Sequence, residues 1–160
     1  MIRVGILTAS TLGARGERED TSGAAIRELI APLGATVEAY QVVTDDQETI
    51  AGLLRAWADE RGLDLILTTG GTGLSPTDVT PEATREVIHR EVPGFAEAML
   101  LEGLKHTPRA MLSRALAGVR GQTLIVNLPG SPRGVQESLG AILGVLPHAL
   151  EILQRKPTDH

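Results

Sequence analysis

The chain of 160 residues contains no cysteine. This absence excludes disulfide bridges, thiolate catalysis and zinc sites with cysteine ligands. Aromatic residues are scarce too, because Tyr40, Trp57 and Phe95 are the only ones. Aliphatic side chains must therefore fill the core. Binding of single-stranded nucleic acid by stacking of bases on aromatic rings is disfavoured for the same reason.

Positive charge and long apolar runs are also in short supply. The formal net charge is −5 at pH 7, whereas a general nucleic-acid binder needs a basic patch. No apolar run approaches the roughly 18 residues that a membrane-spanning helix needs. The chain begins with a strand-like run at residues 2–8 and not with a basic segment followed by a long apolar one. We therefore expect a soluble, cytoplasmic protein that binds neither nucleic acid nor membrane.

Strand-like runs alternate with helical patterns along the chain. Strands are expected at residues 2–8, 36–43, 63–69 and 122–128. Helices are expected at residues 21–33, 46–61, 81–90, 94–105, from 131 onward, and 146–155, while residues 110–119 fit either type. The alternation predicts an α/β fold of three layers, α/β/α, around a mostly parallel central sheet. Residues 1–155 are expected to form one domain, followed by a frayed tail at 156–160.

The most informative segment is TTGGTGLSPTDVTPE, residues 68–82, which follows the third expected strand. Gly70, Gly71 and Gly73 remove side chains from the turn, so its backbone can adopt positive φ angles and its N–H groups can approach a ligand closely. Glycine-rich exits from strands also occur for purely structural reasons. The segment lacks the Gly-Lys-Ser/Thr ending of the nucleoside triphosphatase P-loop and the dinucleotide-binding GxGxxG pattern.

An aspartate and a helix start follow these glycines. Thr80-Pro81 is typical of an N-cap followed by the first helical turn. Asp78 lies just before it, where a carboxylate can hold a Mg²⁺ ion that bridges phosphate oxygens. The alternative is an aspartate that only forms the turn. We favour the metal, so the segment predicts a site for phosphate and a divalent cation.

Three other polar segments follow expected strands. They are Thr8-Ala9-Ser10 with Asp20, Thr44-Asp45-Asp46, and NLPGSPRG at residues 127–134. Ligands of open α/β sheets bind beyond the carboxyl ends of the strands. We therefore expect these segments to converge with the glycine-rich turn at one edge of the sheet.

Each of these segments also has a structural interpretation. Of the two adjacent aspartates, Asp46 is expected to cap the following helix, which leaves Asp45 to face the site. The helix start at Ser131, together with Arg133, is as typical of an anion site as of an ordinary capped helix with a surface arginine. Asn127, at a strand end, either binds a ligand or satisfies the loop backbone.

Signatures of covalent catalysis are missing. The four histidines are scattered without an i, i+4 pair, and no serine lies in a Gly-x-Ser-x-Gly elbow. A protein nucleophile is thus poorly supported, which is consistent with phosphoryl-type transfer, where positioning and electrostatics do most of the work. Ser113-Arg114, in an otherwise apolar stretch, is a second candidate anion contact, with a salt bridge to a partner chain as the alternative.

Five sequence blocks, taken together, resemble one family. TTGGTGLSPTDVTPEAT, PGFAEAML, MLSRALAGVRG, LIVNLPGSPRG and LPHALEIL occur in the order seen in the molybdopterin adenylyltransferase family. That family includes bacterial molybdenum-cofactor biosynthesis proteins of the MogA and MoaB type and the G domain of gephyrin-like proteins. The resemblance, from about residue 2 to residue 153, implies a three-layer α/β fold, a homotrimer or homohexamer, and Mg²⁺-dependent transfer of AMP from ATP to molybdopterin. The molybdate-inserting enzyme is a candidate partner.

The resemblance also points to individual residues. Asp78 and Asp45 match the acidic positions linked to metal binding and catalysis. The candidate contacts to the nucleotide and the pterin, from the resemblance and from the strand-end segments together, are Ser10, Asp20, Gly70, Gly71, Thr72, Gly73, Asn127, Pro129, Gly130, Ser131 and Arg133.

One position departs from the family pattern. Many relatives carry an arginine immediately before the aspartate of the DVTP block, where this chain has Thr77. Candidate replacements for that charge are a residue of a neighbouring subunit, Arg15, Arg18, Arg114 and Arg133.

Three rival functions are weighed against adenylyl transfer. A nucleotide pyrophosphatase of the competence-damage-protein type shares the glycine-rich loop but normally carries a further region. A molybdate-inserting enzyme would be multidomain and much longer. A non-catalytic trimer that binds molybdopterin as a scaffold would keep the same pocket.

Overall fold

The centre of the molecule is a six-stranded sheet. In the computed structural model, which describes residues 1–155, the strands are β1 (Ile2–Ala9), β2 (Ala35–Val43), β3 (Leu65–Thr69), β4 (Arg90–Glu91), β5 (Ala117–Arg120) and β6 (Thr123–Leu128). Their order across the sheet is β2-β1-β3-β6-β5-β4. The first four of these are parallel, whereas β5 runs antiparallel to β6, and β4 runs antiparallel to β5. The predicted, mostly parallel sheet is confirmed.

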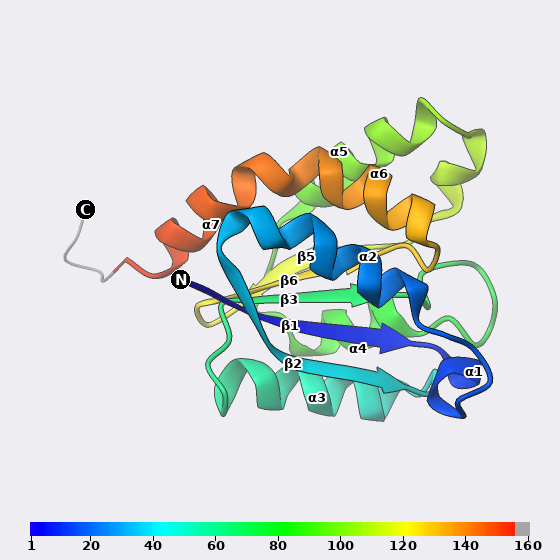
Figure 1. Ribbon diagram of the computed structural model, residues 1–160, viewed down its shortest axis with the longest axis horizontal. Coiled ribbons are helices and arrows are strands. Elements are labelled where there is room, and N and C mark those ends of the chain that lie inside the picture. The colour runs from blue at the N-terminus through cyan, green and yellow to red at the C-terminus, as the bar shows by residue number, and fades with distance from the viewer. Residues whose placement is uncertain (156–160) are drawn as a thin grey trace.

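Helices cover both faces of this sheet (Figure 1). They are α1 (Thr11–Ala14), α2 (Thr21–Ile30), α3 (Gln47–Asp59), α4 (Thr80–Val87), α5 (Pro93–Leu104), α6 (Pro132–Ile142) and α7 (Leu146–Leu153), with short 3-10 helices at Ala31–Leu33, Pro108–Leu112 and Leu143–Val145. In Figure 1, α2, α5, α6 and α7 lie on one side of the sheet, and α3 and α4 lie on the other. This is the predicted three-layer α/β/α arrangement. The tail expected at 156–160 lies outside the described residues.

The strands alternate their side chains between two cores. In β3, which is buried throughout, Leu65 and Leu67 pack with α2, α5 and α6, whereas Ile66 packs with α3 and α4. Successive side chains of a strand point to opposite faces, so a strand covered on both faces must be apolar at every position. The continuous apolar run of this strand in the sequence has that cause.

Two expected elements differ from the structure near the edge of the sheet. The helix expected at 81–90 ends at Val87, because the chain beyond it joins the sheet. The backbone N–H of His89 donates to the carbonyl oxygen of Val119 at 2.7 Å, and Arg90 pairs with Val119 in the ladder. The ambiguous segment 110–119 contains both the end of a 3-10 helix and the start of β5.

The start of α4 also differs from expectation. Val79 occupies the N-cap position and makes no capping bond through its side chain, so the predicted N-cap at Thr80 is wrong. Thr80 is instead the first helical residue, and its backbone N–H donates to the Gly71 carbonyl oxygen at 3.1 Å. This bond ties the start of α4 to the glycine-rich turn.

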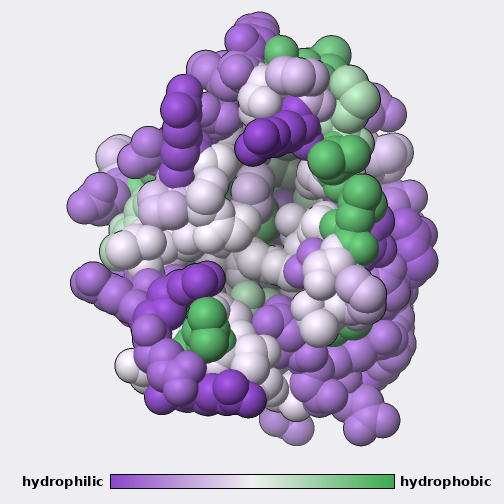
Figure 2. Space-filling view, turned by 90° about the vertical axis from the view of Figure 1, so that its right-hand side faces the viewer, coloured by the Kyte–Doolittle hydropathy of each residue, from purple (hydrophilic) through white to green (hydrophobic). Residues whose placement is uncertain are grey.

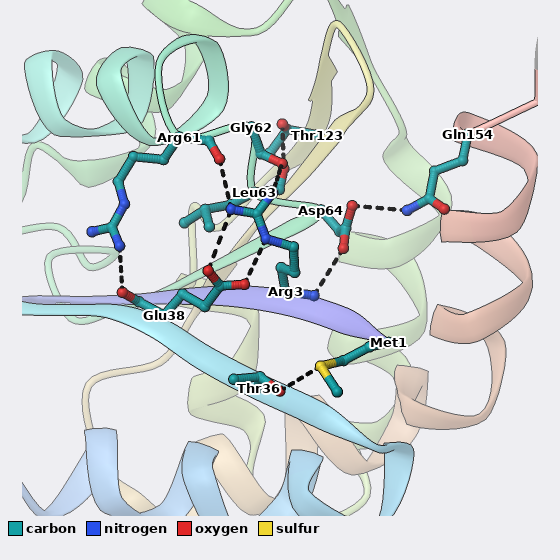
Figure 3. A network of polar contacts seen from close by, with 10 residues as sticks. All are labelled: Met1, Arg3, Thr36, Glu38, Arg61, Gly62, Leu63, Asp64, Thr123 and Gln154. Carbon is teal, nitrogen blue, oxygen red and sulfur yellow. Dashed lines mark hydrogen bonds and ion pairs between the residues drawn. The ribbon is translucent and has the colours of Figure 1, made fainter.

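A polar network closes the amino end of the sheet, away from the predicted site (Figure 3). The guanidinium of Arg3 binds the Glu38 carboxylate at 2.5 Å and the carbonyl oxygens of Arg61 and Gly62 at 2.9 and 3.0 Å. Asp64 accepts from the backbone N–H of Arg3 at 2.8 Å. The network therefore fixes β1, β2 and the segment before β3 relative to one another.

Candidate active site

The carboxyl ends of four parallel strands lie level with one another. Thr69 of β3 pairs with Thr8 of β1 and with Leu128 of β6, and Ala9 of β1 pairs with Val43 of β2. The loops that follow these strands therefore meet at one edge of the sheet, as predicted. Figure 2 looks onto this end of the molecule and shows a central hollow among residues of neutral hydropathy, with hydrophilic residues around much of it.

A cavity of about 330 Å³ lies between these loops, and we call it the strand-end cavity. The predicted site residues that line it are Ser10, Asp20, Asp45, Gly70, Gly71, Asp78 and Gly130. Residues far apart in the sequence thus surround one space.

Gly70 and Gly71 form the part of the glycine-rich turn that faces this cavity. Their φ angles are +90° and +70°, in the region that favours glycine. A Cβ atom would lie 2.4 Å from the Ala9 carbonyl oxygen at Gly70, and 2.3 Å from the Thr80 hydroxyl at Gly71. Neither position therefore accommodates a side chain, which leaves the backbone of the turn open to the cavity.

The backbone N–H groups that follow Gly70 in this turn have no hydrogen-bond acceptor in the part of the chain that the structure describes. Within residues 1–155, the N–H groups of Gly71, Thr72 and Gly73 make no hydrogen bond, whereas that of Gly70 donates to the Leu128 carbonyl oxygen at 3.2 Å. Successive N–H groups in a turn form concavities that bind anions. The turn therefore has three consecutive backbone N–H groups of the kind that can bind an anion.

The adjacent aspartates divide their roles as predicted. Asp46 caps α3, because its carboxylate accepts from the N–H and hydroxyl of Thr49 at 3.0 and 2.6 Å. These donors lower the pKa of Asp46. Asp45 lines the strand-end cavity, and its Oδ2 atom accepts from the N–H and hydroxyl of Thr11 at 3.2 and 3.0 Å. Its Oδ1 atom lies 3.4 Å from where a Cβ of Gly71 would be, so it faces the turn.

Asp78 approaches the same turn from its other end. Its Oδ2 atom accepts from the backbone N–H of Ser75 at 3.1 Å and lies 2.9 Å from where a Cβ of Gly73 would be. Asp45 faces Gly71 and Asp78 faces Gly73, so two carboxylates lie against residues only two positions apart. Both line the strand-end cavity.

Asp20 also lines the strand-end cavity, but both of its carboxylate oxygens accept hydrogen bonds from the protein. It caps α2, and its Oδ1 atom accepts from the Gly23 N–H at 3.0 Å. Its Oδ2 atom accepts from the Thr8 hydroxyl at 2.8 Å and from the Tyr40 hydroxyl. Burial and this bond to Asp20 raise the pKa of Tyr40 to about 12. Because three protein donors already occupy its oxygens, Asp20 is less available to a metal than Asp45 or Asp78.

Both predicted serine contacts cap helices. Ser10 caps α1 and accepts from the Gly13 N–H at 3.0 Å, and Ser131 caps α6 and accepts from the Gly134 N–H at 3.0 Å. Ser10 lines the strand-end cavity, whereas Ser131 lines neither of the two cavities described here.

Asn127 lies in the interior and not in the site. Its side chain is fully buried. Its Oδ1 atom accepts from the Leu116 N–H at 3.2 Å, and its Nδ2 atom donates to the hydroxyls of Thr68 and Thr84, each at 2.9 Å. All three bonds join β6 to its neighbours. Of its two interpretations, binding a ligand or satisfying the backbone, the structure supports the second for Asn127.

Arg133 is likewise not brought to a cavity. Its side chain is 81% exposed and pairs with Glu137 one helical turn away, at 3.1 Å. Of the candidates to replace the charge missing at Thr77, Arg18 lines the strand-end cavity, whereas Arg15, Arg114 and Arg133 do not. The guanidinium of Arg114 instead donates to the carbonyl oxygen of Gly73 at 2.8 Å.

A larger cavity of about 420 Å³ adjoins the same turn, and we call it the helix cavity. Three predicted contacts, Thr72, Gly73 and Pro129, line it together with residues of α5, α6 and the 3-10 helix Pro108–Leu112. No pattern in the sequence indicated this cavity. Its walls are formed largely by helix faces. The helical spacing of apolar residues on such a face is the same whether the face packs into a core or lines a pocket.

Asp45 and Asp78 fit a Mg²⁺ ion whose remaining ligands come from the substrate and from water. Within residues 1–155, no cluster of three or more histidines or acidic residues could form a protein cage around a metal. Mg²⁺ is usually bound through one or two carboxylates together with water and substrate phosphates. Asp45 and Asp78 provide that set. The Thr80 hydroxyl, which is buried beside Gly71 without a partner in residues 1–155, adds an unspent oxygen.

Fold and site together define a class of protein. An open sheet with a turn of unbonded backbone N–H groups and two carboxylates beyond its carboxyl ends is typical of α/β proteins that bind a phosphorylated ligand with a divalent cation. No helix within residues 1–155 is both long enough and apolar enough to cross a membrane.

Comparison with known proteins gives the family. Residues 5–148 match the family described as the probable molybdopterin binding domain. The molybdopterin adenylyltransferase of Helicobacter pylori strain J99 is 40% identical over 154 residues, which cover 95% of this chain and 88% of that protein. The protein belongs to the molybdopterin-binding-domain family, and the resemblance of its sequence blocks is confirmed.

Solved structures agree with this assignment. The molybdopterin biosynthesis enzyme MoaB from Thermus thermophilus matches with a TM-score of 0.92 and 62% identity, over 98% of this chain and 99% of that chain. The molybdopterin biosynthesis Mog protein from Mycobacterium ulcerans matches with a TM-score of 0.89 and 42% identity, over 96% and 99%. The three-layer fold is thus that of the family.

Proposed function

We propose that this protein is a molybdopterin adenylyltransferase, which transfers AMP from ATP to molybdopterin during molybdenum-cofactor biosynthesis. Relatives that carry this name support the reaction. The observation that carries it is that Asp45 and Asp78 both line the strand-end cavity, where Asp45 lies against Gly71 and Asp78 against Gly73 of the same turn. The adenylylated product would pass to the molybdate-inserting enzyme, the partner that the family resemblance implies.

The chemistry is a displacement at phosphorus. A terminal phosphate oxygen of molybdopterin attacks the α-phosphorus of ATP, a new P–O bond forms, and the bond to the bridging oxygen breaks. Pyrophosphate leaves with the electron pair of that bond. The attacking phosphate is largely ionised near neutral pH, so no strong general base is required. Positioning and electrostatic stabilisation supply most of the rate.

The residues of the turn have distinct parts in this reaction. The free N–H groups of Gly71, Thr72 and Gly73 orient phosphate oxygens. Asp45 and Asp78 would hold Mg²⁺, which when bound offsets the negative charge of the reacting phosphates. The remaining predicted contacts in the strand-end cavity, Ser10, Asp20 and Gly130, shape the space around the substrates.

Product analysis tests this function. The protein is incubated with ATP, Mg²⁺ and molybdopterin, and adenylylated pterin and pyrophosphate are measured. Hydrolysis of ATP without pterin would favour the pyrophosphatase. Tight binding of molybdopterin without release of pyrophosphate would favour the scaffold.

Asp78→Asn gives the sharper test of the metal role. We expect it to reduce adenylylation about 100-fold or more, because the negative charge of the carboxylate that would hold Mg²⁺ is lost. Molybdopterin binding should change little. Equal losses in turnover and in pterin binding, the latter measured by titration, would contradict a metal-holding Asp78. Asp46→Asn is the matched control, since Asp46 caps α3 and lies outside the cavity.

We also propose that the protein is a homotrimer or a homohexamer, in which a second copy covers an apolar face. Exposed apolar side chains gather on α5, on the 3-10 helix that follows it and on the turn, namely Leu74, Leu100, Leu101, Leu104, Met111 and Leu112. Soluble monomers rarely expose large contiguous apolar patches. Light scattering during gel filtration should give a multiple of three, and Leu101→Glu should lower it; a monomeric wild type would overturn this.

A further inference from the structure

Within residues 1–155, Arg114 makes all of its side-chain bonds to the segment that carries Asp78. Nε donates to the Gly73 carbonyl oxygen at 2.8 Å, and Nη2 donates to the Asp78 carbonyl oxygen at 2.8 Å. Nη1 binds the Glu82 carboxylate at 2.5 Å. The backbone N–H of Arg114 adds a bond to the Thr72 carbonyl oxygen at 2.9 Å. One residue thus contacts the segment 72–82 at four places.

The bonds of this guanidinium span the loop that holds the catalytic carboxylate. Gly73 and Asp78 are the two ends of a loop without regular structure, GLSPTD. Within residues 73–78, the N–H of Asp78 donates to the Ser75 carbonyl oxygen, and the N–H of Ser75 donates to the Asp78 carboxylate. The Ser75 hydroxyl also accepts from the Thr77 N–H and bonds the Thr77 hydroxyl. Arg114 adds the bonds that join its two ends to one rigid, planar group.

Each of the three nitrogens of this guanidinium makes a bond within the protein. Arg114 lines neither the strand-end cavity nor the helix cavity, although its neighbours Ser113 and Ala115 line the latter. The bond to Arg114 lowers the pKa of Glu82, so this partner stays charged at neutral pH. The charge-assisted bonds of Arg114 are therefore spent inside the protein.

We propose that Arg114 is a positioning residue for adenylyl transfer, which holds the 73–78 loop so that the Asp78 carboxylate faces the strand-end cavity. It acts through Asp78 and does not touch substrate phosphate. A lysine cannot replace it, because a single ammonium group lacks the planar fork that bonds two carbonyl oxygens and a carboxylate at once. Displacement of a reacting group by about 1 Å costs on the order of 100-fold in rate.

Amide hydrogen exchange tests, without any substrate, whether Arg114 holds the 73–78 loop; we call this set of bonds the Arg114 clamp. In the ligand-free protein, Arg114→Lys should speed exchange of peptides covering residues 73–79 by about tenfold or more, because the loop opens more often. Arg120→Lys is the matched control. Arg120 also bonds a carbonyl oxygen, that of Val87 at 2.7 Å, and a carboxylate, that of Asp59 at 2.8 Å, but away from both cavities. It should leave the 73–79 peptides unchanged.

Kinetics then separate positioning from substrate contact. This arm rests on the adenylyl transfer proposed above, and the exchange arm does not. Arg114→Lys should lower kcat about 100-fold and leave the KM for ATP within about twofold. Arg120→Lys should retain the wild-type kcat. Thermal unfolding of each variant shows that it is folded at the assay temperature.

A double variant decides whether the effect of Arg114 runs through Asp78. If it does, adding Arg114→Lys to Asp78→Asn should change the remaining rate by less than about twofold, because residues that act as a unit are not additive. Loss factors that multiply would show that Arg114 acts on substrate by itself and would overturn the proposal. Unchanged exchange of the 73–79 peptides, or a raised KM for ATP with unchanged kcat, would also overturn it. A wild type that forms no product would overturn the function alone, while the exchange result would still decide the clamp.

Discussion

The hydroxyl of Tyr40, on β2, donates a hydrogen bond to Oδ2 of Asp20, which caps α2 at the wall of the strand-end cavity. Tyr40 also lies beneath the guanidinium of Arg27, which is 5.0 Å from the centre of its ring. An exposed edge strand is thereby coupled to a carboxylate of the site. The pKa of Tyr40 rises to about 12 because of burial and of this bond.

Tyr40 offers a clean measurement, because it is the only tyrosine of the chain. Its pKa is raised in the folded protein from 10.0 to about 12. The stabilising contribution of the neutral phenol is therefore complete below pH about 10 and is lost as the pH rises through about 12. Phenolate absorbance should give a midpoint near 12 for the folded protein and near 10 in denaturant.

Removal of the partner should shift that titration. Asp20→Asn should lower the Tyr40 pKa, because the neighbouring negative charge that disfavours the phenolate is gone. Thr8→Val is the control, since it removes another bond of Asp20 but keeps the charge. A wild-type midpoint near 10 in the folded protein would show that the bond between Tyr40 and Asp20 does not form.

The acid side of the stability profile should depend on Glu38. The hydrogen bond from Arg3 lowers the pKa of Glu38 in the folded protein. A carboxylate with a lowered pKa stabilises the fold above its unfolded-state pKa, and this stabilisation is lost as the pH falls through the folded-state value. Glu38→Gln should therefore be less stable than the wild type at pH 7, and the difference should vanish in acid.

Urea unfolding at a series of pH values measures this difference. Glu28→Gln is the matched control, because Glu28 is an exposed glutamate of α2 that forms no ion pair within residues 1–155. Equal pH profiles for Glu38→Gln and the wild type would show that the network at the amino end of the sheet contributes nothing to stability.

Asn127 should behave as a structural residue. Asn127→Ala removes the partner of the Leu116 N–H and of two threonine hydroxyls in the interior and leaves a small void. We expect it to lower the free energy of unfolding by about 2–4 kcal/mol. Denaturant unfolding measures this loss. A variant of wild-type stability that fails to bind molybdopterin would instead assign Asn127 to the site.

The sequence predicted those features that follow from chain direction and periodicity. Parallel strands put Asp45 and Asp78 at one edge of the sheet, and the helix start after Asp46 assigned that residue to the cap. Side-chain direction at a strand end is a different matter. Asn127 lies in β6 and its side chain is buried in the interior, because a change of one residue in a strand turns a side chain to the opposite face.

Hydrogen-bond partners that are distant in the sequence could not be predicted from it either. The bonds of Arg114 join residues 36 and 41 positions apart in the sequence, and no local pattern distinguishes an arginine that binds carbonyl oxygens from one that binds phosphate. The two-residue strand β4 escaped prediction because its pairing with β5 overrides the helical pattern at residues 88–90. In each case tertiary contacts, and not local propensity, decide the outcome.

The Thr80 hydroxyl gives the last prediction. It is fully buried beside Gly71 and has no hydrogen-bond partner within residues 1–155. A buried polar group without a partner costs about 1–3 kcal/mol. Thr80→Val keeps the shape of the side chain and removes that cost, so the ligand-free protein should be equally stable or more stable.

Substrate binding should respond in the opposite direction. If the hydroxyl finds its partner only when ATP and Mg²⁺ occupy the turn, Thr80→Val should bind ATP more weakly in the presence of Mg²⁺ by about tenfold, the worth of one hydrogen bond. Thr84→Val is the matched control, because the Thr84 hydroxyl already donates to the Thr80 carbonyl oxygen at 2.9 Å and accepts from Asn127. That variant should lose about 1–3 kcal/mol of stability. A Thr80→Val protein that loses stability to the same extent would mean that its hydroxyl is bonded without ligand, and the hydroxyl would then have no part in binding.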